Sequence, residues 1–119
     1  MSITVEQYRK LARKPRKYHN QPVSSGGRRF DSKLEARRYD ELTLLQNAGQ
    51  ISDLEVQPRF ALTVNGHLIA QYFGDFSYLD QGNDGALVVE DCKGVKTAVY
   101  RLKKKLVRAL YGIQIQEIS

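Results

Sequence analysis

The stretch ALVVEDCKGVKT, Ala86–Thr97, leads an apolar strand directly into a cluster of charges. Its first four residues predict a strand buried in a sheet. Helical spacing follows over residues 97–111, and the predicted inner side of this helix consists of Val99, Leu102, Leu106, Ala109 and Leu110. The alternation in IQIQEI (113–118) predicts a short final strand. A strand–helix–strand unit predicts a parallel crossover. We therefore expect an α/β fold, with a mixed sheet flanked by helices.

Upstream, residues 31–49 have the pattern of an amphipathic helix. Ser32 and Glu35 are spaced as a capping box, and Gly49 stands where a C-terminal glycine is expected. The predicted buried side of this helix consists of Leu34, Leu42, Leu45 and Ala48.

Between the two helices, three strands are expected. ISDLEVQPRFALTV (51–64) predicts extended segments, with Pro58 restricting their backbone hydrogen bonds. Asn65-Gly66 predicts a hairpin between FALTV (60–64) and HLIAQYFGDFSYL (67–79). DQGNDG (80–85) predicts a turn into the strand that begins at Ala86. With a short N-terminal helix from Thr4 to about Leu11, the expected order is helix, helix, three strands, helix, strand.

Residues 13–30, RKPRKYHNQPVSSGGRRF, combine two prolines, a Gly-Gly pair and dense positive charge. This composition predicts an exposed, mobile arm. The arm is either a solubilising tail or a phosphate-contacting segment that becomes ordered on binding. We expect residues 1–30 to form the basic N-terminal helix and arm, and residues 31–119 the folded core of a single domain.

Composition narrows the class of protein. The chain has 119 residues and no apolar run long enough to span a bilayer, so the expected compartment is the cytoplasm. A single cysteine excludes an intrachain disulfide. The net charge of +6 is unevenly spread, because residues 1–30 and 91–119 are basic whereas residues 31–90 carry ten acids and four bases. Basic ends suggest a polyanionic partner, and an acidic middle suits that partner only if a cation lies between them.

Side-chain alternation brings candidate metal ligands together. Asp91 and Lys93 emerge on the same face as Leu87 and Val89, at the end of an apolar row. If the preceding strand pairs through the DQGNDG turn, Asp75 comes close to Asp91. Two carboxylates at an apolar sheet edge repel each other and lose solvation, and a divalent cation removes that penalty. Mg²⁺ typically uses one or two carboxylates, water and substrate phosphate.

Other residues near this pair have open roles. Lys93 could orient a water or stabilise negative charge on a phosphate, and Cys92 could lend its backbone carbonyl to the ion. Glu35 is either a helix-capping residue or a third carboxylate that faces the sheet edge. A register error of one residue would exchange Glu90 with Asp91.

These residues, in this order, resemble the PD-(D/E)XK nuclease motif. FDSKLEARRYDEL (30–42), QPRFAL (57–62), DFSY (75–78) and VVEDCKGVKTAVYRLKKKL (88–106) are similar to small phage and prophage proteins of that superfamily, from about Tyr18 to Ile118. The resemblance implies a restriction-endonuclease-like αβββαβ core. The residue two before the lysine is Asp91, where many members have Glu, and the motif permits either. Gln57, Tyr100 and Lys103 match positions that sometimes support the site in such proteins.

The resemblance also implies an activity, which is Mg²⁺-dependent hydrolysis of DNA phosphodiester bonds with Mn²⁺ as a substitute. It assigns Glu35, Asp75 and Asp91, with Cys92 beside them, to one or two metal ions, and Lys93 to the phosphate or water. We expect phage-encoded DNA recombination, repair or processing in a bacterial host, with a homodimer where both strands are cut. The alternative is a non-catalytic DNA-binding accessory protein that keeps a nuclease fold. In either case the expected DNA contacts are Arg28, Arg29, Arg101, Lys103, Lys104, Lys105 and Arg108.

Overall fold

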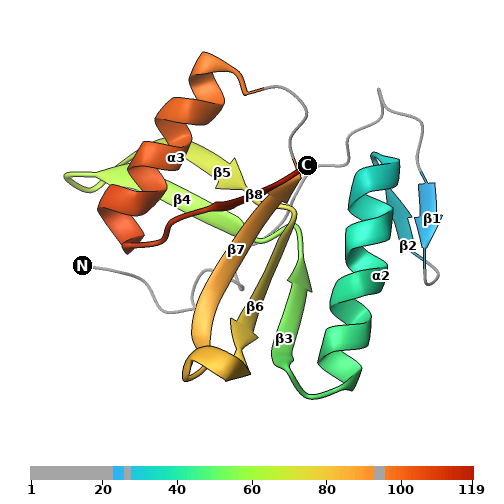
Figure 1. Cartoon of the computed structure of the whole chain (residues 1–119). Coiled ribbons are helices and arrows are strands. Elements are labelled where there is room, and N and C mark those ends of the chain that lie inside the picture. The colour runs from blue at the N-terminus through green and yellow to red at the C-terminus, as the bar shows by residue number, and fades with distance from the viewer. Residues whose placement is uncertain (1–22, 26–27, 93–95) are drawn as a thin grey trace.

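The computed structural model describes residues 23–25, 28–92 and 96–119, and the predicted helix near Thr4 lies outside these residues. Its elements confirm a mixed α/β fold with two helices beside a mixed sheet (Figure 1). In chain order they are β1 Val23–Ser25, β2 Arg28–Phe30, α2 Lys33–Asn47, β3 Ile51–Val56, β4 Arg59–Val64, β5 His67–Phe73, β6 Phe76–Asp80, the 3₁₀ turn η1 Gln81–Asn83, β7 Ala86–Cys92, α3 Ala98–Tyr111 and β8 Gln116–Ile118. Neither α2 nor α3 is long and apolar enough to cross a bilayer.

The central sheet has four strands in the order β3–β6–β7–β8. β6 pairs antiparallel with β3 and β7, and β8 runs parallel to β7, as the predicted crossover requires. On one face α2 packs over a cluster that includes Leu42, Phe76 and Tyr78. On the other face α3 and the β4–β5 pair enclose a second cluster around Val89 and Val107. β7 lies between the two clusters and contributes side chains to both.

The extended segments 51–64 and 67–79 both break at the same level of the fold. Gln57 and Pro58 interrupt the first segment, and Gly74 and Asp75 interrupt the second, so that β4–β5 form a separate two-stranded sheet. A Cβ on Gly74 would stand 3.0 Å from Val89 Cγ1 and 3.3 Å from Pro58 Cγ, and only glycine fits this approach without displacing a neighbour. The expected strand over residues 67–79 is therefore wrong at Gly74, and the bend sets Asp75 apart from both strands.

Two predicted turns are confirmed. Asn65 and Gly66 both take positive φ, 50° and 79°, which is the backbone of a two-residue hairpin turn. The segment DQGNDG forms η1 and then passes through Asp84 and Gly85, also at positive φ, into β7. These turns fix which residues of β4 and β5, and of β6 and β7, lie opposite each other.

Helix α2 begins as its sequence predicts, but the C-terminal half of the helix is less buried than predicted. The Ser32 hydroxyl accepts from the Glu35 backbone N–H at 3.1 Å, which satisfies one of the free amide groups at the helix start. Leu42 is fully buried, Leu45 is half-buried and Ala48 is exposed. The prediction that Ala48 is buried is wrong because the last turn of α2 extends past the packed cluster.

Helix α3 is rotated about its axis relative to the predicted orientation. Val99 and Leu102 were expected to face inward, but they are 61% and 59% exposed. Tyr100 and Val107 are the buried residues instead. The aromatic ring of Tyr100 packs against Tyr72 of β5, with ring centroids 6.4 Å apart, and this contact turns the tyrosine face of the helix toward the core.

The segment expected to be a mobile arm ends in paired strands. β1 and β2 are antiparallel, with Val23 opposite Phe30, and Phe30 is buried under α2 in contact with Tyr39 and Phe76. The prediction of an exposed arm is therefore wrong at Phe30. Burial of an aromatic side chain at residue 30 ties this segment to the domain core.

Helix α2 offers a matched pair of leucines that tests the packing. Leu42→Ala should reduce the free energy of unfolding by about 2–5 kcal/mol, since it removes a fully buried side chain. Leu44→Ala, at a position that is 69% exposed, should change it by less than about 0.5 kcal/mol. Urea unfolding followed by circular dichroism measures both. Equal losses would contradict the described orientation of α2.

Candidate metal and nucleic-acid site

Strand β7 sends its acidic residues to opposite faces of the sheet. Glu90 lies opposite Phe76 in the β6–β7 register and shares the α2 face with Val88. Asp91 shares the α3 face with Val89. Both carboxylates are 1% exposed. The sequence leaves open whether Glu90 or Asp91 is the candidate metal ligand. The two carboxylates are equally buried and differ in the side chains that surround them.

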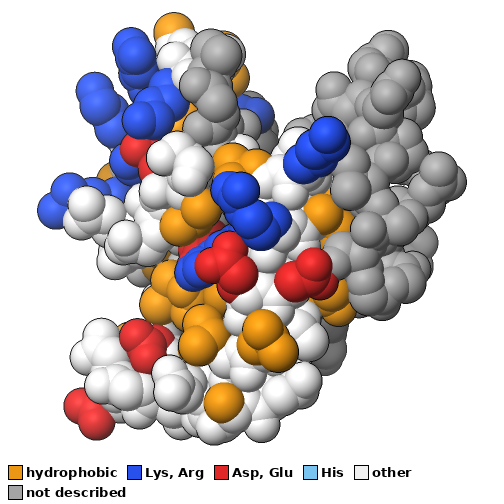
Figure 2. Space-filling model, turned by 45° about the vertical axis from the view of Figure 1, so that its right-hand side comes forward, with side chains coloured by type: hydrophobic (Ala, Val, Ile, Leu, Met, Phe, Trp, Pro, Cys, Tyr) orange, Lys and Arg blue, Asp and Glu red, His pale blue; other side chains and the backbone are white. Residues whose placement is uncertain are grey.

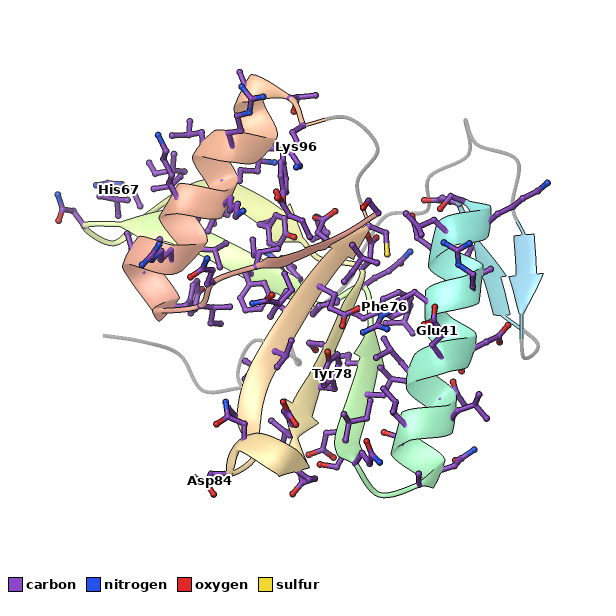
Figure 3. All side chains as sticks on the ribbon, in the orientation of Figure 1. Glu41, His67, Phe76, Tyr78, Asp84 and Lys96 are labelled. Atoms are coloured by element: carbon purple, nitrogen blue, oxygen red, sulfur yellow. The ribbon has the colours of Figure 1, made fainter. Side chains whose placement is uncertain are left out.

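On the α2 face, Glu90 belongs to an ion-pair network. Arg38 donates from Nε to Glu90 Oε1 at 2.8 Å and from Nη2 to Oε2 at 2.6 Å, and the Tyr78 hydroxyl donates to Oε2 at 2.5 Å. Tyr78 comes from β6 (Figure 3) and belongs to the cluster of buried residues that α2 covers. A two-point arginine–carboxylate pair is strong and directional. It neutralises Glu90 and fixes α2 against β7, so Glu90 has a structural partner.

On the α3 face, Asp91 and Asp75 lie at the bend. Continuing the β6–β7 register by one pair sets Asp75 opposite Asp91, and the Asp75 N–H donates to the Glu90 carbonyl at 2.9 Å. The Tyr72 hydroxyl donates to Asp91 Oδ2 at 2.5 Å, and the Cys92 N–H donates to Asp75 Oδ2 at 2.6 Å. Asp75 is 7% exposed. The structure thus brings together the two strand carboxylates that the sequence singled out.

The half-buried Cys92 side chain lies near four carboxylates. Burial, together with the negative charges of Asp75, Glu35, Glu90 and Asp91 in that order, raises the pKa of its thiol to about 12. The pKa of Tyr72 is also raised, first by burial and then by the charge of Asp91. Nearby carboxylates thus help to keep the Cys92 thiol and the Tyr72 hydroxyl protonated. The electrostatic potential around these two groups is therefore negative.

Asp75 and Asp91 are the two candidate protein ligands for a divalent metal ion. Among the residues that the structure describes, no three His, Cys, Asp or Glu side chains are grouped to hold one ion. Glu35 is 8% exposed on α2 and close enough to act on the Cys92 thiol, but it does not complete a triad with Asp75 and Asp91. Two neighbouring carboxylates still meet the usual protein contribution to an Mg²⁺ site.

Three predicted site residues are outside this description. Lys93 lies in the segment 93–95, which the structure does not describe. Arg28 and Arg29 lie on β2, whose backbone is described, whereas their side chains are not. Their predicted roles stay predictions.

Four predicted DNA contacts line one pocket of about 400 Å³ between α3 and β8. Lys and Arg side chains gather at this end of the molecule (Figure 2). Lys103 is half-buried and is not part of the pocket. The complete lining is Lys96, Arg101, Lys104, Lys105, Arg108, Gln114 and Glu117.

Glu117 connects this pocket to the strand that carries Asp91. It lies beside Asp91 in the parallel β7–β8 register. Its carboxylate accepts from the Tyr100 hydroxyl at 2.9 Å and pairs with Lys96 Nζ and Lys104 Nζ, each at 3.3 Å. The Tyr100 hydrogen bond, followed by the two lysines, lowers the pKa of Glu117, which is therefore ionised at neutral pH.

Sequence reasoning missed most of the partners that hold these acids. Arg38 and Tyr72 lie far along the chain from the carboxylates they contact, so no local pattern reveals them. Lys96 and Glu117 had a weak signal, since both flank elements of the predicted crossover. Only the β7–β8 pairing brings Glu117 beside Asp91.

The Arg38–Glu90 pair generates a stability prediction. Arg38→Met should lower the free energy of unfolding by about 3 kcal/mol, because it leaves the Glu90 carboxylate buried without its ion-pair partner. Glu41→Gln removes the exposed carboxylate that contacts Arg38 at 3.5 Å and should cost less than about 1 kcal/mol. Chemical denaturation of both variants at pH 7 measures the difference. Unchanged stability in Arg38→Met would contradict the network.

The raised pKa of Cys92 generates a reactivity prediction. Because the folded thiol stays protonated until about pH 12, iodoacetamide in EDTA should alkylate native protein at pH 8 at least roughly a hundredfold more slowly than urea-unfolded protein. The native rate should rise steeply with pH above 9, provided that the protein stays folded. Mass spectrometry follows the single cysteine. Equal rates in the two states would contradict the buried, acidic setting.

Comparison with known proteins gives one result. No curated protein and no solved structure matches the chain. A family model described as "Protein of unknown function (DUF1064)" matches residues 15–117, which include both helices, the central sheet and the pocket between α3 and β8. The match covers well over half of the chain, and the protein therefore belongs to the DUF1064 family.

Proposed function

We propose that this protein is a metal-dependent endodeoxyribonuclease that hydrolyses DNA phosphodiester bonds. The observation that carries the proposal is the pair Asp75 and Asp91, two buried carboxylates, one at the bend before β6 and one on the neighbouring strand β7. Burying two like charges this close is costly unless a cation compensates them. The resemblance of DFSY and VEDCKG to the PD-(D/E)XK motif supports the same assignment.

In this proposal Asp75 and Asp91 hold Mg²⁺, with Mn²⁺ as a substitute. When bound, the metal supplies Lewis acidity for phosphodiester hydrolysis. Tyr72 orients Asp91 through its hydroxyl, and the Cys92 N–H orients Asp75. Lys93 stabilises the phosphate or the attacking water through its positive charge. Glu35, on α2, is the third carboxylate proposed to contribute to metal binding.

The basic residues of α3 would hold the DNA backbone. Arg101, Lys104, Lys105 and Arg108 recur on one side of the helix and line the pocket beside β8. Contacts of this kind fix the position of a strand and carry little sequence information. With one site in each chain, cutting both strands requires two copies. The proposed setting is DNA processing in the bacterial cytoplasm.

A second function has its own supporting observation. The described residues contain no group of three metal-binding side chains, and five Lys and Arg side chains line the pocket between α3 and β8. A protein that binds DNA without cutting it would need the pocket and not the metal. In that case Asp75 and Asp91 would be remnants of a site, or would be completed by a partner.

A cleavage panel separates these functions. Labelled duplex, single-stranded and four-way-junction DNAs are incubated with Mg²⁺, Mn²⁺ or EDTA. Wild-type protein should cut only with metal, and Asp91→Asn and Lys93→Ala should each slow cutting by at least about a hundredfold. Asp84→Asn is the control, because it removes one carboxylate in the η1–β7 turn, at the opposite end of β7 from Asp91, and asparagine tolerates positive φ.

Each outcome decides between the two functions. Cutting that requires metal, survives in Asp84→Asn and is lost in the two site variants supports the nuclease. Binding to the same DNAs with no cutting in either metal contradicts the nuclease and supports the accessory protein. Cutting that persists in Asp91→Asn would show that the hydrolysis arises elsewhere.

A further inference from the structure

We infer that the pocket between α3 and β8 binds a phosphate of a nucleic-acid strand, and that the Glu117 carboxylate occupies the place of this phosphate in the free protein. The inference rests on the proposed function for the identity of the ligand as nucleic acid. It adds a specific anion site and an internal competitor for that site.

The contacts of Glu117 are those of a bound anion. Three donors in the N-terminal half of α3 and just before it converge on the two oxygens of Glu117: the Tyr100 hydroxyl, Lys104 Nζ and Lys96 Nζ. Lys96 precedes α3, Tyr100 and Lys104 lie one turn apart on it, and Glu117 comes from β8. Phosphate oxygens accept from the same donors, and each carries negative charge as the carboxylate does.

The charge around Glu117 exceeds what one carboxylate can neutralise. Arg101, Lys105 and Arg108 also line the pocket, so five cationic side chains surround a single acid. On α3, positions 101, 104, 105 and 108 follow the helical repeat and form one continuous stripe toward β8. A further anion is therefore expected there, and the Glu117 side chain is 24% exposed, which leaves it accessible to exchange.

The position of the pocket favours a nucleic-acid strand over an acidic polypeptide. Glu117 pairs directly with Asp91 across the β7–β8 ladder, so the pocket and the proposed metal site are on neighbouring strands. A polymer with a phosphate at every unit can place one phosphate in the pocket and another near Asp91. An isolated acidic side chain offers only the first of these contacts.

Glu117 then opposes binding, since it neutralises Lys96 and Lys104 and repels an incoming phosphate. Glu117→Gln keeps the shape of the side chain and the acceptor for Tyr100, and it releases both lysines. We expect roughly five- to tenfold tighter binding of a labelled oligonucleotide than wild type in EDTA. The dependence of log affinity on log salt, measured between about 50 and about 200 mM, should become steeper by about one.

The matched control is Asp84→Asn. It makes the same change of one unit in net charge at the far end of the sheet from Lys96 (Figure 3). Its affinity should stay within about twofold of wild type, which separates a local effect from a general increase in positive charge. In the background Lys96→Gln/Lys104→Gln, adding Glu117→Gln should give much less than the fivefold gain, because the lysines it releases are absent.

Fluorescence anisotropy with single-stranded and duplex oligonucleotides, in EDTA and with polyglutamate as competitor, gives the answer. Tighter binding by Glu117→Gln and not by Asp84→Asn supports the inference, whether or not the protein cuts DNA. Equal or weaker binding by folded Glu117→Gln overturns it, even if Mg²⁺-dependent cutting is found. Competition by polyglutamate at the same charge concentration as the oligonucleotide overturns the assignment to phosphate.

If Glu117→Gln does not fold, as judged by circular dichroism, Lys105→Gln replaces it. Lys105 lines the pocket and is exposed, so this variant should keep the fold. It should bind the oligonucleotide at least about threefold more weakly than wild type, with a shallower salt dependence. Unchanged affinity in Lys105→Gln would also overturn the inference.

Discussion

The close approach of Gly74 to Val89 and Pro58 is the constraint on which much of this structure depends. Because residue 74 has no side chain to crowd Val89 and Pro58, the backbone between β5 and β6 passes close to β7 and changes direction there. The segment 51–64 breaks at the same level, where Gly74 N–H donates to the Pro58 carbonyl at 2.9 Å. The bend separates the two sheets, makes space for α3, and leaves Asp75 at the junction.

The second organising feature is the sorting of charge across β7. Glu90 and Asp91 are adjacent in sequence and equally buried, yet one meets an arginine and the other meets tyrosine and a neighbouring carboxylate. The first environment stabilises the fold through a paired charge, and the second concentrates negative potential. Strand alternation alone produces this division, since successive side chains point to opposite faces.

The sequence predicted the mixed sheet, the parallel crossover, the helix starts and the tight turns, because each depends on residues close together in the chain. It also predicted the proximity of Asp75 and Asp91, since the η1 turn fixes their register. It failed for the rotation of α3, where a long-range contact between Tyr100 and Tyr72 outweighs the hydrophobic pattern of the helix. The Arg38–Glu90 pair was equally out of reach, because it joins residues 52 positions apart.

The hydrogen bonds of the tyrosines affect the intrinsic fluorescence of this protein. The chain contains no tryptophan, so tyrosine dominates its near-ultraviolet absorption and its intrinsic emission. Among the tyrosines that the structure describes, three donate their hydroxyls to carboxylates: Tyr72 to Asp91, Tyr78 to Glu90 and Tyr100 to Glu117. Proton-accepting carboxylates quench phenol fluorescence. The emission of each of these three tyrosines therefore depends on its hydrogen bond to the carboxylate. A ligand that draws Asp91 or Glu117 away from its tyrosine would change the light the protein emits, with no label attached.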